Sequence, residues 1–294
     1  MSKYLIVNAD DFGMCSAANE AVFDLFLSGR LKSSTIMMPC PAAEAAVEFS
    51  KAHPEFAIGI HTTLTSEWDT YRWKPFTNGK SLLDPQGYMW PDSTLVEKNA
   101  DYKELMAEMR AQIDAAHNMG MKPSHIDNHM GSLYGNKTGR FTLLRLAFRV
   151  CGEYGYAYRM FSKADKAVLP AGTPLVALRA AALMGKLWSK VYGVPTIDYL
   201  LFPDWGAEDI RRCRTYEEYR KLILNIWFTI PEGITETFVH PCVENDELKG
   251  IVGMWEHRVW EYQLMKDPET EKALNAHGIT LISYRDMLEM RKAK

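Results

Sequence analysis

The sequence predicts an α/β fold, a single-domain deformed (β/α) barrel that is TIM-barrel-like with about seven parallel strands. A strand-like run followed by a helix-like pattern recurs about seven times, which implies parallel strands joined by crossover helices. The strand-like runs are nearly continuous in apolar residues, as expected for strands covered on both faces. The 294 residues fit one barrel domain, which commonly has roughly 250 residues. An open sheet is the alternative, because these patterns distinguish it poorly from a barrel.

The expected strands are runs rich in β-branched and aromatic residues. In chain order they are Tyr4–Ala9, Ser33–Met38, Phe56–His61, Ser124–His129, Tyr156–Met160, Glu236–His240 and Ile279–Ser283, with Ile197–Phe202 as a weaker candidate. The helix-like patterns are Ala17–Ser28, Ala42–Ala52, Tyr102–Met119, Thr138–Cys151, Leu175–Tyr192, Tyr216–Trp227, Met254–Met265 and Tyr284–Met290. On the third of these helices, Glu104, Glu108 and Arg110 form a charged face that we expect to be exposed to solvent.

One segment departs from this alternation of strands and helices. Residues 66–101, here called the aromatic insertion, are polar, contain three prolines and carry six Trp, Tyr or Phe residues. Loops of that length are usually functional or disordered, and the many aromatic side chains argue against disorder. The segment follows His61 closely, so we expect it to form a wall or lid over a site at that strand end.

Composition and charge exclude several classes of protein. The formal net charge of −3 and the lack of a Lys/Arg run argue against nucleic-acid binding. The five cysteines are scattered, with no C-x-x-C pair, which argues against a disulfide framework or a structural zinc cluster. No stretch approaches the ~20 apolar residues of a membrane span, and no secretory signal is recognisable. We therefore expect a cytoplasmic protein with a small-molecule substrate and no nucleic-acid or membrane partner.

Polar residues gather where the expected strands end. Asp10 and Asp11 close the first strand, His61 closes the third, and His240 closes a late one. In α/β barrels the strand ends at one face carry the catalytic groups, because the loops there converge on a common mouth. For a single His at a strand end, such as His61 or His240, a structural role is the more common alternative.

The adjacent carboxylates Asp10 and Asp11 suggest two roles at one mouth. Neighbouring residues on a strand point to opposite sides, but both can reach the mouth where the chain turns at Gly13. One carboxylate can then bind a cation while the other takes a proton from water. The alternative is a turn in which an aspartate caps the helix that begins near Ser16.

The run Ser124–His129 is the strongest local signal. Read as a strand, it places His125, Asp127 and His129 on one face. Read as a helix, it would make the two histidines i,i+4 partners, but Pro123 and Gly131 favour a strand followed by a loop. Imidazole binds zinc and other first-row ions, and a neighbouring carboxylate can fix its tautomer. A polar surface edge is the alternative.

Four motifs resemble those of the YdjC-like (ChbG-type) carbohydrate deacetylases in order and approximate spacing. They are Asn8–Gly13, Gly59–Thr65, Ser124–His129 and Thr235–Pro241, and Arg30–Thr35, Pro41–Ala46 and Tyr158-Arg159 also fit. The resemblance extends over roughly residues 3–290, nearly the whole chain. It implies a deformed (β/α) barrel that hydrolyses the N-acetyl group of an amino sugar or chito-oligosaccharide, and it suggests a homodimer.

The resemblance also implies roles for individual residues. One divalent metal ion would be bound by Asp11, His61 and His125, with Asp10 as the base that activates water. His240 would be the acid, and Arg159 would steady Asp10 or bind substrate. The further substrate-binding residues we expect are His129, Asp127, Trp68 and Trp73, the two tryptophans as flat faces for sugar rings. Trimming the aromatic insertion should then raise KM more than it alters metal affinity.

The metal and the substrate are less closely defined. Two imidazoles and a carboxylate favour zinc or another transition ion, whereas the family resemblance suggests magnesium. The sequence departs from the family at Met130-Gly131, where another His is usual, and at Cys242, where Gly is usual. Two alternatives are another metal-dependent hydrolase, acting on a phosphoester or a different amide, and a non-catalytic sugar-binding protein on the same fold.

Overall fold

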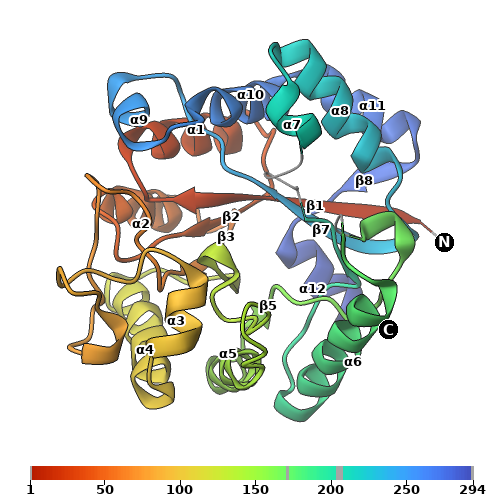
Figure 1. Ribbon diagram of the computed structural model, residues 1–294. Coiled ribbons are helices and arrows are strands. Elements are labelled where there is room, and N and C mark those ends of the chain that lie inside the picture. The colour runs from red at the N-terminus through yellow and green to blue at the C-terminus, as the bar shows by residue number, and fades with distance from the viewer. Residues whose placement is uncertain (1, 170–171, 203–207, 293–294) are drawn as a thin grey trace.

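The strands form one curled parallel sheet with its helices outside, as the computed structural model shows for residues 2–169, 172–202 and 208–292 (Figure 1). The sheet order is β5-β4-β3-β2-β1-β7-β6, and β8 pairs with β1. The strands are β1 (Lys3–Phe12), β2 (Ser33–Ile36), β3 (Ala57–Thr62), β4 (His125–Asn128), β5 (Ala157–Tyr158), β6 (Tyr199–Leu200), β7 (Gly233–Val239) and β8 (Ile279–Leu281). A parallel bridge between Phe161 and Ile197 links the chain beyond β5 to the chain before β6. The predicted single-domain deformed barrel is therefore confirmed.

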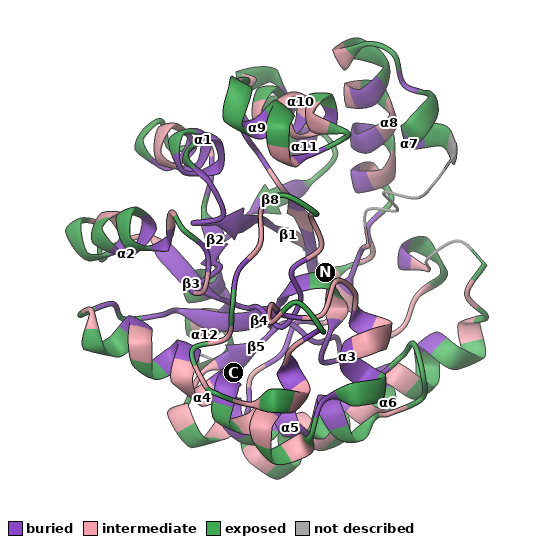
Figure 2. Cartoon of the chain, turned by 60° about the vertical axis from the view of Figure 1, so that its left-hand side comes forward, coloured by how far each residue is buried: buried purple, intermediate pink, exposed green. Residues whose placement is uncertain are grey.

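The helices surround the sheet, and most have a buried side and a side exposed to solvent (Figure 2). The helices are α1 (Ser16–Leu27), α2 (Ala43–Ala52), α3 (Ser93–Asn99), α4 (Tyr102–Asn118), α5 (Thr142–Tyr154), α6 (Leu175–Tyr192), α7 (Glu208–Arg212), α8 (Tyr216–Phe228), α9 (Asp246–Ile251), α10 (Trp255–Lys266), α11 (Pro268–Ala276) and α12 (Tyr284–Lys292). In the described ranges, no helix is long and apolar enough to cross a membrane.

All eight expected strands and all eight expected helices are present, with shifted ends. The helices α3, α7, α9 and α11 were not expected. They are short, between five and nine residues, so each offers little periodicity for a pattern to detect. The α3 helix lies within the aromatic insertion, so part of this segment has regular structure.

Two of the three charged residues expected on an exposed face of α4, Glu104 and Glu108, anchor the aromatic insertion, so the expectation is wrong for them, whereas Arg110 is half-buried and pairs with Glu153. Glu108 is fully buried, and its carboxylate accepts hydrogen bonds from the backbone N–H groups of Phe76 and Thr77 and from the Thr77 hydroxyl. Glu104 accepts hydrogen bonds from the backbone and hydroxyl of Ser81. These two carboxylates therefore satisfy backbone donors of the insertion that the barrel would otherwise leave without an acceptor.

Replacing Glu108 with Ala is expected to lower the free energy of unfolding by ~2 kcal/mol, because buried donors lose their acceptor. Urea unfolding followed by circular dichroism measures this change. Glu289→Ala is the matched control, since Glu289 lies on α12 and pairs with exposed Lys292, and it should change stability by less than ~0.5 kcal/mol. Equal stability of the two variants would contradict an anchoring role for Glu108.

Candidate metal centre and active site

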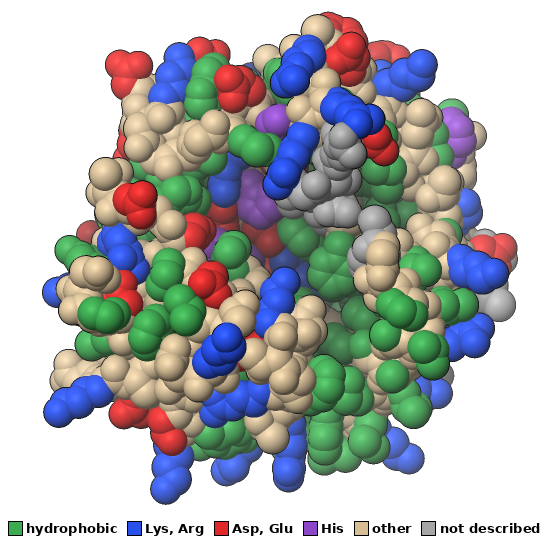
Figure 3. Space-filling view, in the orientation of Figure 1, with side chains coloured by type: hydrophobic (Ala, Val, Ile, Leu, Met, Phe, Trp, Pro, Cys, Tyr) green, Lys and Arg blue, Asp and Glu red, His purple; other side chains and the backbone are tan. Residues whose placement is uncertain are grey.

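A cavity of about 480 Å³ opens at the carboxyl ends of the strands. Figure 3 shows it as a hollow with histidine and acidic side chains at its floor. Its lining combines ionisable and apolar side chains: Asp10, Asp11, His61, Glu67, Asn128, His129, Met130, Gly131, Tyr134, Asn136, Lys137, Arg159, Phe202, Phe238, His240, Val252, Met254 and Arg258. Residues from distant parts of the chain therefore meet at the face where barrel enzymes place their chemistry.

The local backbone at the end of β1 turns Asp11 into this cavity. The pairing of β1 with β2 shifts register between Ala9 and Phe12, and Asp11 has a φ of 60°. A positive φ is uncommon for a residue with a side chain, although Asp adopts it more readily than most. Gly13 follows with a φ of 84°, and a Cβ there would lie 3.0 Å from the Cα of Ala43. Because of this turn, the side chains of Asp10 and Asp11 line the same cavity.

Asp11, His61 and His129 present three possible metal-binding atoms to one another. Asp11 Oδ1 lies 3.5 Å from His61 Nε2 and 3.2 Å from His129 Nδ1. The two ring nitrogens are 3.3 Å apart. Asp11 Oδ1 is buried and has no hydrogen-bond partner in the described part of the chain, while Asp11 Oδ2 accepts a hydrogen bond from Arg258 Nη1 at 2.8 Å.

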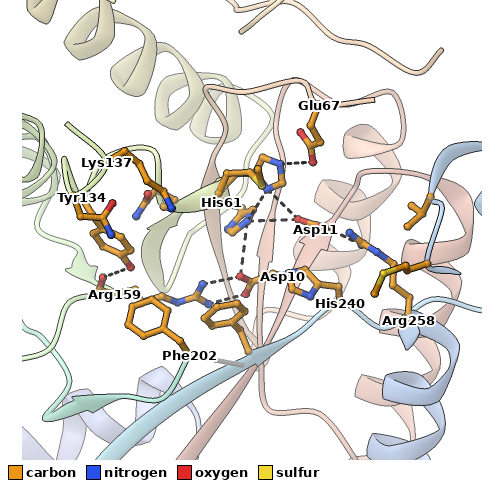
Figure 4. Close-up of a pocket in the computed structure, with 18 residues that line it drawn as sticks. Asp10, Asp11, His61, Glu67, Tyr134, Lys137, Arg159, Phe202, His240 and Arg258 are labelled. Atoms are coloured by element: carbon orange, nitrogen blue, oxygen red, sulfur yellow. Dashed lines mark hydrogen bonds and ion pairs between the residues drawn. The ribbon is translucent and has the colours of Figure 1, made fainter. Parts of the chain in front are cut away.

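A carboxylate on the far side of each imidazole fixes its tautomer, and Figure 4 shows the one supplied by Glu67. His61 Nδ1 lies 2.6 Å from Asp127 Oδ1, and His129 Nε2 lies 2.9 Å from Glu67 Oε1. An ionised carboxylate can only accept, so each ring places its proton there and turns its other nitrogen, as a lone pair, toward Asp11. With both rings neutral, three acceptors then face one another, an arrangement that positive charge between them stabilises.

The pKa of His129 also indicates that positive charge is favoured between these groups. Burial disfavours charge on its ring, yet the Glu67 and Asp11 carboxylates raise the pKa of His129 to about 10. Burial likewise opposes ionisation of Asp11, but Arg258 and the surrounding rings hold the pKa of that carboxyl well below its usual range. In the absence of a metal ion, a proton on His129 therefore takes the place of the positive charge. One carboxylate and two imidazoles suit a divalent ion such as zinc.

A second group of possible ligands, Asp10, His61 and Asp127, is already satisfied by other partners. Asp127 Oδ1 accepts a hydrogen bond from His61 Nδ1, and its Oδ2 accepts a hydrogen bond from Thr35 and pairs with Arg159 Nη2 at 2.7 Å. Both oxygens of Asp10 accept hydrogen bonds from Arg159 at 2.7 Å. These carboxylates are therefore less available to a metal than Asp11 is.

Arg159 organises the floor of the cavity. Besides the bonds to Asp10 and Asp127, its Nε donates to Glu236 Oε1 at 2.6 Å, and Glu236 in turn accepts from the Tyr284 hydroxyl. Burial opposes ionisation of Asp10, but the Arg159 guanidinium lowers its pKa to about 2. Asp10 is thus an ionised carboxylate held in a fixed orientation beside the three possible ligands.

His240 lies on the opposite side of Asp10 from Arg159 (Figure 4). Its backbone N–H donates to Glu261 Oε2 at 2.7 Å, and its ring Nδ1 lies 3.9 Å from the same oxygen. Burial lowers the pKa of His240 to about 4, despite the opposing effect of Asp11. The ring is consequently neutral near pH 7.

The structure does not bring His125, the expected third ligand, to this cluster. The His125 ring is fully buried, stacks on Tyr284 with centroids 3.6 Å apart and contacts Ser124 Oγ through Nδ1. It does not line the cavity. The reason is the position of each residue along β4. His125 is the first residue of the strand and lies deep in the barrel, whereas His129 follows the last residue and lies at the carboxyl end, where the cavity opens. His129, expected to bind substrate, occupies the position that the sequence analysis gave to His125.

Three other expected substrate-binding residues also lie outside the cavity lining. Asp127 is fully buried and holds His61 and Arg159. Trp73 is buried and donates its indole N–H to the Thr65 carbonyl. Trp68 packs edge-on against Trp73. The aromatic side chains, other than histidines, that do line the cavity are Tyr134, Phe202 and Phe238.

Three residues that were not predicted from the sequence, Glu67, Arg258 and Glu236, bind His129, Asp11 and Arg159 respectively. One indication of Glu67 was present in the sequence, because it is an acidic residue six positions after the candidate ligand His61. Arg258 lies on α10, and no nearby motif marks it. Glu236 lies in an apolar strand, where a carboxylate requires a buried partner, so its position was informative without naming Arg159 as that partner.

Comparison with known proteins gives consistent relatives. The family model described as YdjC-like protein matches residues 4–276. A Listeria innocua serovar 6a protein named carbohydrate deacetylase 2 is 39% identical over 292 residues, with 96% of this chain and 98% of the relative covered. A Geobacillus stearothermophilus carbohydrate deacetylase is 26% identical, with 99% and 100% covered. The crystal structure of an Enterococcus faecalis V583 protein named for cellobiose-phosphate cleavage has a TM-score of 0.73 and 25% identity, with 98% of this chain and 99% of that chain covered.

Proposed function

The chain belongs to the YdjC-like family, and we propose that it is a metal-dependent hydrolase that removes an N-acetyl group from an amino sugar or chito-oligosaccharide. The proposed ligands are Asp11, His61 and His129. The observation that carries this proposal is that the buried Asp11 Oδ1 lies 3.5 Å from His61 Nε2 and 3.2 Å from His129 Nδ1, while a carboxylate binds the other nitrogen of each ring. The names of the two relatives compared by sequence support the choice of a carbohydrate amide as substrate.

A divalent cation in this site supplies a Lewis acid, which lowers the pKa of water and polarises an amide carbonyl. Asp10 is the proposed base, because its ionised carboxylate lies beside the ligands and Arg159 fixes its orientation. The fixed orientation aligns one carboxylate oxygen with the water that attacks the acetyl carbon. Arg159 is therefore assigned to steadying Asp10.

His240 is the proposed acid that protonates the departing amine. Its ring is neutral at the start, because burial lowers its pKa to about 4. The ring must therefore accept the proton that Asp10 takes from water before it can donate that proton to the amine nitrogen. Glu261, which accepts from the His240 backbone, keeps the ring at the cavity wall.

The cavity walls suit a sugar ring. Phe202, Phe238 and Met254 offer apolar faces, while Asn136 and Lys137 offer hydrogen-bond donors. Mostly apolar cavities with a few convergent polar groups are typical of small-molecule sites. Figure 4 shows Lys137 and Tyr134 across the cavity from His240.

Acetate release from N-acetylated chito-oligosaccharides of graded length tests the proposal. We expect release that a chelator abolishes and that added Zn²⁺ or another divalent ion restores, because water activation depends on the cation. Elemental analysis of the purified protein identifies the ion. Acetate release that persists after complete metal removal would contradict the proposed mechanism, and hydrolysis of phosphoesters alone would contradict the proposed substrate.

A further inference from the structure

We propose that Glu67 is a positioning residue of the metal centre, so that the aromatic insertion, which reaches the cavity through Glu67, controls metal affinity. The proposal rests on the function proposed above, since it assigns His129 as a ligand. Glu67 Oε1 lies 2.9 Å from His129 Nε2, and the Glu67 side chain is 17% exposed. It is the second residue of the aromatic insertion.

The tautomer of His129 is set by the partners of its ring and not by its backbone. His129 follows the last residue of β4, and the chain then turns through Met130 and Gly131, whose φ values are 56° and 63°. A neutral imidazole can carry its proton on either nitrogen. Only the tautomer with the proton on Nε2 leaves the lone pair of Nδ1 for a metal, and the Glu67 carboxylate selects that tautomer by accepting the proton's hydrogen bond.

His61 provides an internal comparison. Its Nδ1 proton is held by Asp127 at 2.6 Å, on the next strand of the sheet. Each proposed imidazole ligand therefore has its own carboxylate partner, one from the barrel and one from the aromatic insertion. Carboxylate partners of this kind fix ring orientation and raise ligand basicity, and their loss typically lowers metal affinity 10–100-fold.

The residue next to Glu67 supports the remaining ligand. The Arg258 guanidinium lies 5.9 Å from the centre of the Trp68 ring, within the range of a cation–π contact. Arg258 donates to Asp11 Oδ2, which leaves Oδ1 directed at the imidazoles. Backbone and side-chain bonds of Ser66 to Trp90 and Trp73 hold this start of the insertion in place. Two adjacent residues of the insertion therefore support two of the proposed ligands: Glu67 contacts His129, and Trp68 contacts Arg258, which binds Asp11.

The test compares Zn²⁺ affinity of the wild type, Glu67→Gln and Glu104→Gln by competition with a chromophoric chelator. Glutamine keeps the size of Glu67 but removes the charge and can donate to Nε2, which permits the tautomer that cannot bind metal. Glu104→Gln is the matched control, because Glu104 anchors the same insertion through Ser81 and does not line the cavity. We expect 10–100-fold weaker Zn²⁺ binding for Glu67→Gln, with one ion per chain retained, and wild-type affinity for Glu104→Gln.

Each outcome decides the proposal. Wild-type affinity in Glu67→Gln would overturn it, as would equal weakening in both variants, which would show that a loosened insertion suffices. If the wild type itself binds no metal, the proposed function fails first. Circular dichroism checks the fold of each variant. Glu67→Asp, which withdraws the carboxylate by ~1.5 Å, gives a second reading and should also bind Zn²⁺ more weakly.

Discussion

The Asp10→Asn variant is expected to bind metal like the wild type while its turnover falls by ~10²–10⁴-fold. Asp10 is held by Arg159 and is not one of the three proposed ligands, so its loss should leave the cluster of Asp11, His61 and His129 intact. An amide oxygen in the same place accepts a hydrogen bond from water but cannot take its proton. Chelator competition measures the metal affinity, and acetate release measures turnover.

Asp11→Asn is the matched variant, since it makes the same chemical change one residue away. It removes the anionic ligand and should lose metal and activity together. If Asp10→Asn lost metal while Asp11→Asn retained it, the roles of the two aspartates would be exchanged. Thermal unfolding of both variants checks stability, because Asp10→Asn removes one of the three carboxylates that surround Arg159.

The barrel was predictable because its signals are local. Runs such as Tyr4–Ala9 and Phe56–His61 are apolar enough to read as covered strands, and β1 and β3 occupy them. The gathering of polar residues at strand ends also follows from the chain, because parallel strands end at the same face. Asp10, Asp11, His61 and His240 accordingly all line one cavity.

The depth of a residue inside the barrel was not predictable in the same way. His125, Asp127 and His129 share a face by alternation alone, but their layer depends on what covers them. Tyr284, from the far end of the chain, stacks on His125 and closes the lower layer. Glu67 reaches His129 from the aromatic insertion. Both contacts join residues far apart in sequence, and no local pattern records them.

The assignment of the third ligand has its sharpest test in a pair of histidine variants. His129→Ala should weaken metal binding by more than ~100-fold, since loss of a partner behind a ligand already costs 10–100-fold, and acetate release should fall with it. His125→Phe should leave metal affinity within ~3-fold of wild type. Phenylalanine preserves a ring to stack on Tyr284, and His125 Nε2 has no hydrogen-bond partner to lose in the described part of the chain.

The two variants also separate stability from metal binding. His125→Phe removes the contact of Nδ1 with Ser124 Oγ, so we expect a stability loss of ~1 kcal/mol that is the same with and without metal. His129→Ala should abolish the rise in unfolding temperature that added Zn²⁺ gives the wild type, because a ligand stabilises only the state that binds it. The reverse pattern, with metal lost in His125→Phe and kept in His129→Ala, would return the third ligand to His125 and contradict the cluster on which the proposed function depends.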